Sequence, residues 1–256
     1  MTAANTTTST VLITGGSRGL GRDMALRLAG QGHHVLITYH SNQEAARQVV
    51  QQIRDRGGQA QAFQLDTSTT AGFGAFAETL RSYLEQQGVD GLNYLVNNAG
   101  TALYAGIAEV SEAQMDEVYN IHYKGVFFLT QRLLPLMKDG GGIVNISSGL
   151  TRLSFPGSSV YGSLKAAVET LTRYQAKELG PRRIRANVVA PGAVETDFGG
   201  GRVRNSPALK EQLASITALG RVGQASDIGG IVAFLCSPDA GWINAQRIEA
   251  SGGTAL

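Results

Sequence analysis

The sequence predicts an α/β protein, a single doubly wound domain of the Rossmann type with a parallel sheet of seven strands covered by helices on both faces. Short apolar runs alternate with longer helical patterns along the whole chain, as is typical of repeated βαβ units. The 256 residues suffice for one such domain, and no linker rich in proline, serine or glycine divides them. We expect a flexible polar lead at 1–10 and one domain at 11–256.

The seven expected strands are the apolar runs at 11–14, 35–38, 60–65, 92–96, 143–146, 184–190 and 246–249. Helical spacing of apolar residues predicts helices at 21–29, 42–56, 70–86, 112–138, 159–179 and 226–236. The stretch 195–206 contains three consecutive glycines and no regular pattern, and a short helical pattern follows at 208–219. We expect 195–220 to form a mobile lid near the strand ends.

Composition and charge exclude several functional classes. The 22 Lys and Arg residues nearly balance the 20 Asp and Glu residues, so nucleic acid is not expected as the main partner. No segment has the roughly 20 apolar residues that a membrane span needs, so no membrane partner is expected. The four histidines are scattered and no metal site is expected. A single cysteine, Cys236, fits a reducing cytoplasm.

A glycine-rich loop joins the first expected strand to the first helix. It reads Thr14-Gly15-Gly16-Ser17-Arg18-Gly19-Leu20-Gly21. Glycines let the backbone turn sharply and approach a pyrophosphate, and a helix N-terminus offers free N–H groups and a positive dipole end. The spacing is G-x-x-x-G-x-G, which differs from the strict G-x-G-x-x-G pattern, so the position of the loop after the first strand carries the prediction of a dinucleotide site.

The segment after the second strand indicates which dinucleotide binds. It reads Thr38-Tyr39-His40-Ser41-Asn42 and has no carboxylate before Glu44. A carboxylate here usually binds the ribose diol of NAD, whereas a phosphorylated ribose prefers basic and hydroxyl groups. We therefore expect NADPH, with Arg18, His40 and Ser41 contacting the 2′-phosphate, and NADH as the alternative. An Arg18 that is merely a surface arginine is the other interpretation.

Tyr161 and Lys165 are the candidates for proton transfer. They are four residues apart at the start of a helical pattern, so both project from the same face. A free tyrosine titrates near ~10, and a neighbouring cation favours its phenolate form. Ser147-Ser148 and Asn97-Asn98-Ala99-Gly100 each follow an expected strand, at the carboxyl ends where such sheets bind ligands.

Together these motifs resemble the classical short-chain dehydrogenase/reductase family over nearly the whole chain. The resemblance rests on Thr14-Gly15-x-x-x-Gly19-x-Gly21, Asn97-Asn98-Ala99-Gly100, Asn120, Ser148, Tyr161-x-x-x-Lys165, and Pro191-Gly192 with Thr196. It implies that Tyr161 is the general acid in carbonyl reduction and the base in alcohol oxidation. It also implies that Ser148 binds the substrate oxygen and that Lys165 lowers the pKa of the tyrosine and contacts the nicotinamide ribose.

Two of these assignments have alternatives. The resemblance implies that Asn120 holds a water molecule that relays protons, but an asparagine inside a helix can also be satisfied locally. Ser147 competes with Ser148 because both end the same strand, and the family spacing to the tyrosine favours Ser148.

The resemblance implies a larger set of cofactor contacts along the strand ends. The expected residues are Gly15, Ser17, Arg18, Gly19, Leu20, Gly21, His40, Ser41, Asp66, Thr67, Asn98, Ala99, Gly100, Tyr161, Lys165, Pro191, Gly192, Val194 and Thr196. Asp66 is equally well explained as the N-cap of the following helix. Pro191-Gly192 is also a plausible turn without a ligand.

The expected substrate pocket is mostly apolar, which suits an aromatic, aliphatic or acyl ketone better than a free sugar. Its wall includes Thr101, Leu103, Tyr104, Gly149, Leu150, Leu153, Phe155 and Phe198, with Ser148 at the reacting oxygen. The chain is similar overall to 3-oxoacyl-carrier-protein reductases, in which basic residues receive an acidic acyl carrier protein. Lys138, Arg182, Arg183 and Arg185 are candidates for that role, and a solvated charged turn is the alternative.

The expected activity is therefore reversible, NADPH-dependent reduction of a ketone to a secondary alcohol. NAD-dependent oxidation of a sugar, polyol or other alcohol is disfavoured by the missing acid after the second strand. A non-catalytic nucleotide sensor would not need Ser148, Tyr161 and Lys165 together. The helices at 112–138 and 159–179 resemble those that pair subunits in this family, which implies a homotetramer. Ala250-Ser251-Gly252-Gly253 lacks the acid that usually precedes the paired glycines in the region of subunit contacts.

Overall fold

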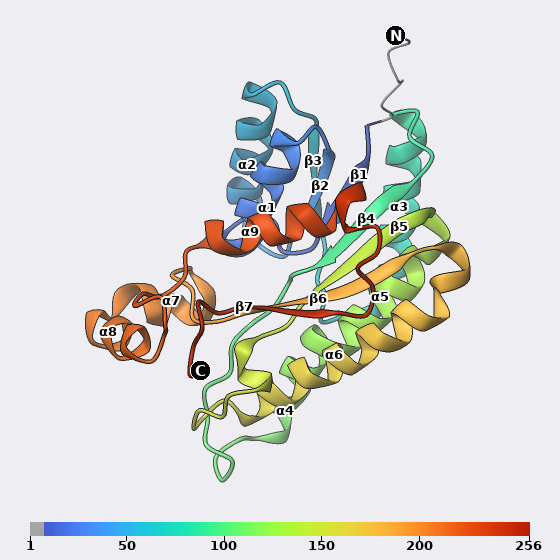
Figure 1. The fold of residues 1–256 in the computed structure, drawn as a ribbon. Helices are drawn as coiled ribbons and strands as arrows, with labels where there is room; N and C mark the ends of the chain where they lie inside the picture. The colour runs from blue at the N-terminus through green and yellow to red at the C-terminus, as the bar shows by residue number, and fades with distance from the viewer. Residues whose placement is uncertain (1–7) are drawn as a thin grey trace.

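The computed structural model describes residues 8–256, so most of the predicted lead at 1–10 lies outside the described residues. A central sheet lies between helices on its two faces (Figure 1). Its order is β3-β2-β1-β4-β5-β6-β7, and all pairings are parallel. The strands are β1 (Thr10–Ile13), β2 (His34–Tyr39), β3 (Ala60–Gln64), β4 (Leu92–Asn97), β5 (Met137–Ile146), β6 (Arg185–Pro191) and β7 (Arg247–Ala250). The predicted doubly wound sheet is confirmed.

The helices follow the strands in the alternation that the sequence predicts. They are α1 (Gly19–Gly30), α2 (Gln43–Asp55), α3 (Phe73–Gln86), α4 (Glu112–Tyr119), α5 (Gly125–Leu133), α6 (Ser159–Glu178), α7 (Phe198–Asn205), α8 (Pro207–Ser215) and α9 (Ala225–Leu235). None of the helices in the described part of the chain is both long and apolar enough to cross a membrane.

Side-chain alternation along the buried strands explains why both faces are covered. In β1, Val11 and Ile13 pack with residues of α1, α2 and α9, whereas Leu12 between them packs with residues of α3 and α5. All three side chains are fully buried. A strand that is apolar on both faces needs a helix layer on each, and crossover connections of the βαβ type supply these layers.

The helix predicted at 112–138 is interrupted, and its predicted end is wrong. A π-helical segment, η2 (Asn120–Lys124), separates α4 from α5, and a 3-10 turn, η3 (Leu134–Leu136), ends the run. A Cβ at Gly125 would lie 2.2 Å from the Thr67 carbonyl oxygen, so glycine permits the helix to approach the loop after β3 this closely. Lys138 lies in β5 rather than at a helix end.

The predicted lid at 195–220 contains helical turns interrupted by a kink. Its first part forms α7, in which Gly199, Gly200 and Gly201 all have positive φ angles. That backbone region is open to glycine at no steric cost, which explains why three glycines stand in succession. The Ser206 side chain then accepts a hydrogen bond from the Leu209 N–H and caps the start of α8.

The basic cluster predicted near the end of α6 does not form as one exposed surface. Arg185 is only 8% exposed, and its guanidinium donates to the Leu235 carbonyl oxygen at 3.0 Å at the end of α9. Arg182 is paired with Asp139, and Lys138 lies 3.6 Å from an Asp90 oxygen. The placement of Arg185 in an exposed patch is therefore wrong, because a long side chain at the start of a buried strand turns inward to satisfy helix-terminal carbonyls.

We expect the Arg185→Ala substitution to lower the free energy of unfolding by about 2–4 kcal/mol, because it leaves a cavity and buried carbonyl oxygens without a donor. Denaturant unfolding measures the change. The Arg183→Ala variant is the matched control, since Arg183 is exposed at the same turn, and a change within about 0.5 kcal/mol is expected there. Equal stability of the two variants would contradict the structural role of Arg185.

Candidate active site

The candidate site lies along the carboxyl edge of the sheet. β1 pairs with β2 on one side and with β4 on the other, so successive connections leave in opposite directions and open a crevice at this point. The glycine loop follows β1, the Asn98–Gly100 segment follows β4, Ser148 follows β5 and the Pro191-Gly192 turn ends β6. The parallel sheet thus brings together motifs that are far apart in the sequence.

Close backbone packing joins the glycine loop to the end of β4. A Cβ on Gly21 would lie 2.3 Å from the Gly15 carbonyl oxygen and 2.7 Å from the Asn98 amide nitrogen. That amide donates to the carbonyl oxygens of Thr14 at 2.9 Å and Gly15 at 3.2 Å. The Thr14 hydroxyl accepts from the N–H groups of Asn98 and Ala99, each at 3.0 Å. Thr14 is thus a positioning residue that the sequence analysis did not assign.

The loop and the first turn of α1 fit a dinucleotide. Gly15 and Gly19 have φ angles of 66° and 53°, which only glycine adopts freely. No side chain caps the N-terminus of α1 at Arg18, so its first N–H groups remain directed to a ligand. Such a terminus stabilises the negative charge of a pyrophosphate.

The adenosine end of the site contains the groups predicted to contact a 2′-phosphate. Arg18, His40 and Ser41 are all exposed at the ends of β1 and β2. Asp66 accepts hydrogen bonds from the Ser68 N–H and hydroxyl, at 2.8 and 2.6 Å, and the Ser68 hydroxyl in particular lowers the pKa of the Asp66 carboxyl. Asp66 therefore stabilises the turn after β3, but it is not the N-cap of the following helix, because α3 begins after Gly72.

The loop after β6 reaches the other end of the glycine loop. The Thr196 Cβ would lie 3.5 Å from a Cβ on Gly19, and the Thr196 hydroxyl accepts from the Phe198 N–H. A Cβ on Gly192 would lie 2.8 Å from the Ser251 Cα, so this turn packs tightly against the C-terminal segment. Val194 pairs with Gly223. Gly192, Val194 and Thr196, which the resemblance implies as cofactor contacts, thus lie in one loop beside the glycine loop.

Ser148 and Tyr161 form the candidate reactive pair. The Ser148 hydroxyl accepts from the Leu150 N–H at 3.2 Å, and it lies close enough to the Tyr161 hydroxyl to act against the rise in the pKa of that tyrosine. Ser147, the competing serine, is 2% exposed and donates to Glu169 at 2.7 Å, away from the tyrosine. The geometry therefore supports Ser148 as the hydroxyl beside the substrate oxygen.

Lys165 is buried behind Tyr161. Its Nζ donates to the Ile146 carbonyl oxygen at 2.7 Å and lies 5.7 Å from the centre of the Tyr161 ring. Burial lowers the pKa of Lys165 to about 7. Burial also raises the pKa of Tyr161, with Tyr104 adding to the rise and the Ser148 hydrogen bond opposing it. In the chain alone the expected lowering of the tyrosine pKa is therefore not seen, and the phenol is held in its proton-donating form.

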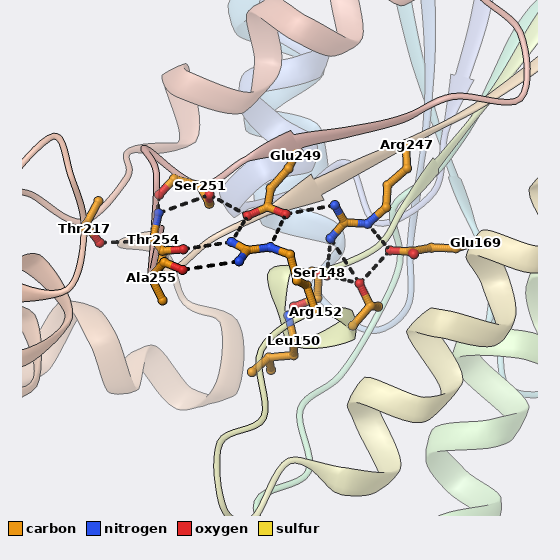
Figure 2. Close-up of polar contacts among 11 residues, drawn as sticks. Ser148, Leu150, Arg152, Glu169, Thr217, Arg247, Glu249, Ser251, Thr254 and Ala255 are labelled. Carbon is orange, nitrogen blue, oxygen red and sulfur yellow. Dashed lines mark hydrogen bonds and ion pairs between the residues drawn. The ribbon is translucent and has the colours of Figure 1, made fainter.

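A network of ion pairs supports the Ser148 loop, as Figure 2 shows. Arg247 on β7 pairs with Glu169 of α6 at 2.8 Å and with Glu249 at 2.9 Å, and it donates to the Ser148 carbonyl oxygen at 3.4 Å. Arg152 also pairs with Glu249, at 2.7 Å, and this contact is the largest cause that lowers the pKa of Glu249 to about 2.

The same network holds the C-terminal segment against the site. Arg152 donates to the Thr254 carbonyl oxygen at 2.8 Å, and the Ser251 hydroxyl donates to Glu249 at 2.8 Å. Sequence reasoning missed this network because its partners are far apart in the chain. The alternating Arg247 and Glu249 on one strand were the only local signal.

Asn120 and His122 both lie in the π-helical segment η2. Asn120 begins the π-helical segment, and its carbonyl oxygen accepts from the Gly125 N–H. The residue of this segment that packs against Tyr161 is His122, with ring centres 5.2 Å apart. The sequence signal for His122 was only a histidine within a helical pattern, which any core histidine shares.

Aromatic side chains lie near Tyr161. Phe198 of α7 lies 5.8 Å from Tyr161 between ring centres, and the Arg202 guanidinium lies 4.7 Å from the Tyr104 ring centre. Phe155 is exposed, and Leu150 and Leu153 are half-buried, in the loop after β5. The lid and this loop therefore offer an apolar, aromatic surface beside the reactive pair.

The fold, the glycine loop and the Ser148, Tyr161 and Lys165 group define an NAD(P)-dependent oxidoreductase. A sequence-family model described as enoyl-(acyl carrier protein) reductase matches residues 15–255. The chain therefore belongs to the short-chain dehydrogenase/reductase family.

Its relatives include named carbonyl reductases. The 3-oxoacyl-[acyl-carrier-protein] reductase FabG of Staphylococcus aureus is 36% identical over 248 residues, covering 96% of this chain and 98% of that protein. LugOII, a promiscuous reductase of lugdunomycin biosynthesis, matches with a TM-score of 0.91 and 39% identity, covering 97% of this chain and 98% of that one. The angucycline C-6 ketoreductase LanV, solved with bound NADP, matches with a TM-score of 0.91 and 38% identity, covering 97% of this chain and 96% of its own.

The lowered pKa of Lys165 makes the stability of the fold dependent on pH. Between about 7 in the folded protein and about 10.4 in the unfolded chain, the unfolded state binds the extra proton. The free energy of unfolding should therefore rise by about 1–2 kcal/mol from roughly pH 7 to roughly pH 8.5.

Denaturant unfolding across this range, with the Lys165→Met variant, measures the effect. The rise should disappear in that variant and persist in Lys177→Met, since Lys177 is exposed on the same helix. A rise of equal size in the wild type and in Lys165→Met would assign it to another group.

Proposed function

We propose that the protein is an NADPH-dependent reductase that converts an apolar, aromatic or acyl ketone reversibly to a secondary alcohol. The observation that carries this proposal is the placement of Tyr161 near Ser148, with the Nζ of the buried Lys165 5.7 Å from the centre of the tyrosine ring, at the carboxyl edge of the sheet. The bound cofactor supplies a hydride to the carbonyl carbon. The Tyr161 hydroxyl then gives its proton to the carbonyl oxygen, and the Ser148 hydroxyl donates a hydrogen bond to that oxygen.

Burial supports this direction of proton transfer. The raised pKa of Tyr161 keeps the phenol protonated near neutral pH, which is the form that a general acid requires. The Lys165 Nζ is fixed on the Ile146 carbonyl oxygen and provides the nearby positive charge that stabilises the phenolate left behind.

The exposed groups at the adenosine end support NADPH over NADH. Arg18 and the His40-Ser41 pair offer one guanidinium, one imidazole and one hydroxyl where a 2′-phosphate would lie. The nearest carboxylate, Asp66, already accepts three hydrogen bonds from Ser68 and Thr69. The bound NADP in LanV agrees with this choice.

The aromatic side chains near Tyr161 support a free ketone as the substrate. Tyr104, Phe155 and Phe198 present flat apolar surfaces, and the ketoreductases LugOII and LanV support such a substrate class by similarity. A carrier-bound acyl chain, as the name of FabG suggests for that relative, remains within the proposed class. The ion pairs of Lys138 and Arg182 do not favour the carrier-docking surface predicted near α6.

Exposed apolar side chains on the helices support assembly into a homotetramer. They include Met115 of α4, Phe127 of α5, Tyr174 of α6, Phe234 of α9 and Trp242 after α9. A closed tetramer of dihedral symmetry would bury such side chains at its interfaces. The buried free thiol of Cys236 suits a reducing compartment.

We expect the Arg18→Ala substitution to lower kcat/KM for NADPH by about 10- to 100-fold, because it removes a charge-assisted contact to the 2′-phosphate. The value for NADH should change by less than about threefold, since that cofactor lacks the phosphate. Arg22→Ala is the matched control, because Arg22 on the same helix donates to Gln52 at 2.8 Å. An equal loss with both cofactors would refute the proposed role of Arg18.

Activity is tested by cofactor oxidation against a panel of aryl ketones, β-ketoesters, acyl-thioesters and sugars. We expect NADPH to be consumed with members of the first three groups. The Tyr161→Phe variant should lose at least about 100-fold in kcat, since it lacks the proton donor, while its affinity for NADPH stays close to that of the wild type. Substantial turnover by Tyr161→Phe would contradict the mechanism, and turnover of sugars with NADH alone would favour the polyol dehydrogenase alternative.

A further inference from the structure

His122 is fully buried in the π-helical segment, within the walls of the candidate site. Its ring meets the Tyr161 ring edge to face, with an interplanar angle of 85° and ring centres 5.2 Å apart. Its Nε2 lies 2.8 Å from the Thr101 carbonyl oxygen and 3.1 Å from the Thr101 backbone nitrogen. One side chain thus contacts both the proton donor and the segment that follows the Asn97–Gly100 motif.

The hydrogen bonds require a neutral imidazole. Nε2 either donates to the Thr101 carbonyl or accepts from the Thr101 N–H, and Nδ1 has no hydrogen-bond partner among residues 8–256 in either tautomer. A second proton on Nδ1 would be buried without an acceptor, which is costly. The ionisable groups that face the ring are Tyr161 and Lys165 of α6, and burial, assisted by Lys165, lowers the pKa of His122 well below its usual value.

The surrounding backbone is shaped to this ring. A Cβ on Gly100 would lie 2.6 Å from His122 Cε1, so any larger residue at position 100 would displace the imidazole. The π-helical widening at 120–124 determines where His122 lies on the helix surface. Single π-helical turns are often found at functional sites. The glycine, the widened helix and the Thr101 contact are three separate features that hold one ring in place.

We propose that His122 is a positioning residue of the reductase, a neutral imidazole that fixes the Tyr161 ring relative to Thr101 and so aligns the Tyr161 hydroxyl with Ser148. His122, rather than Asn120, connects the helix to the reactive tyrosine. This inference rests on the proposed function, because the alignment serves proton transfer to a carbonyl oxygen. A small misplacement of a reacting group has a large effect on the rate.

Two substitutions separate the hydrogen bonds from the ring contact. His122→Asn keeps an amide that both donates to the Thr101 carbonyl and accepts from the Thr101 N–H. His122→Phe keeps an aromatic edge for Tyr161 but leaves the Thr101 groups without a partner. We expect each variant to lower kcat by about 10- to 100-fold, because each removes one of the two contacts through which the ring connects Tyr161 to Thr101. The dissociation constant for NADPH should remain within about twofold in both variants, because neither substitution touches the glycine loop.

Steady-state kinetics with the best ketone of the panel and NADPH fluorescence titration give these values, with thermal unfolding to verify that each variant is folded. A wild-type kcat in His122→Phe would overturn the proposal. So would a wild-type kcat in His122→Asn, which lacks the ring contact, and so would a loss of kcat matched by a loss of NADPH affinity, which would indicate a merely structural role.

A measurement without substrate keeps this inference separate from the proposed function. ¹⁵N NMR of the imidazoles, with the exposed His40 as reference, identifies the His122 signal by its absence in His122→Asn. We expect that signal to remain that of a neutral ring from about pH 5 to about pH 8, whereas a titration near the ordinary value of about 6.5 would overturn the proposal. If no ketone is reduced by the wild type, the proposed function fails, and the NMR result still decides whether His122 is held as described.

Discussion

A chain of buried amide hydrogen bonds beneath the site fixes the geometry on which the chemistry depends. The Asn97 amide of β4 donates to Asn145 of β5 at 2.8 Å and to Thr130 of α5 at 3.2 Å. The Asn145 amide in turn donates to Thr172 and Gln175 of α6, each at 2.8 Å. Buried amides without partners are costly, so these contacts permit essentially one register between the two strands and the two helices. α6 bears Tyr161 and Lys165, and α5 continues the segment that contains His122, so the amide chain sets where all three lie.

This constraint allows the ammonium group of Lys165 to be buried away from water. Moving the Lys165 ammonium out of water is unfavourable, and the Ile146 carbonyl oxygen at 2.7 Å offsets only part of the cost. The lowered pKa of Lys165 measures the remainder. Looser packing would admit water to this ammonium group. The buried amide hydrogen bonds oppose that change because they hold the strands and helices together. The contacts of Arg247 constrain the site further, because they connect β7 and α6 to the loop that contains Ser148.

The sequence predicted the parts of the molecule that depend on local pattern. Apolar runs located every strand, since the strands of a sheet covered by helices on both faces are rich in apolar residues. The spacing of Tyr161 and Lys165 predicted their shared face, because helix periodicity is local. Arg185 and His122 were misplaced or missed for the opposite reason. Whether an arginine turns inward, or a helix widens by one residue, depends on partners such as the Leu235 and Thr101 carbonyl oxygens, which lie far away in the chain.

The division between rigid and adaptable parts indicates how this fold varies its substrates. Tyr161, Lys165 and His122 are all on helices packed against the sheet, whereas Phe198 and Arg202 lie on α7, whose three glycines in succession have positive φ angles. The two parts meet where the Phe198 ring lies 5.8 Å from that of Tyr161. Substitutions in α7 can therefore change the side chains beside Tyr161 without moving Tyr161 itself, because α6 packs against β6.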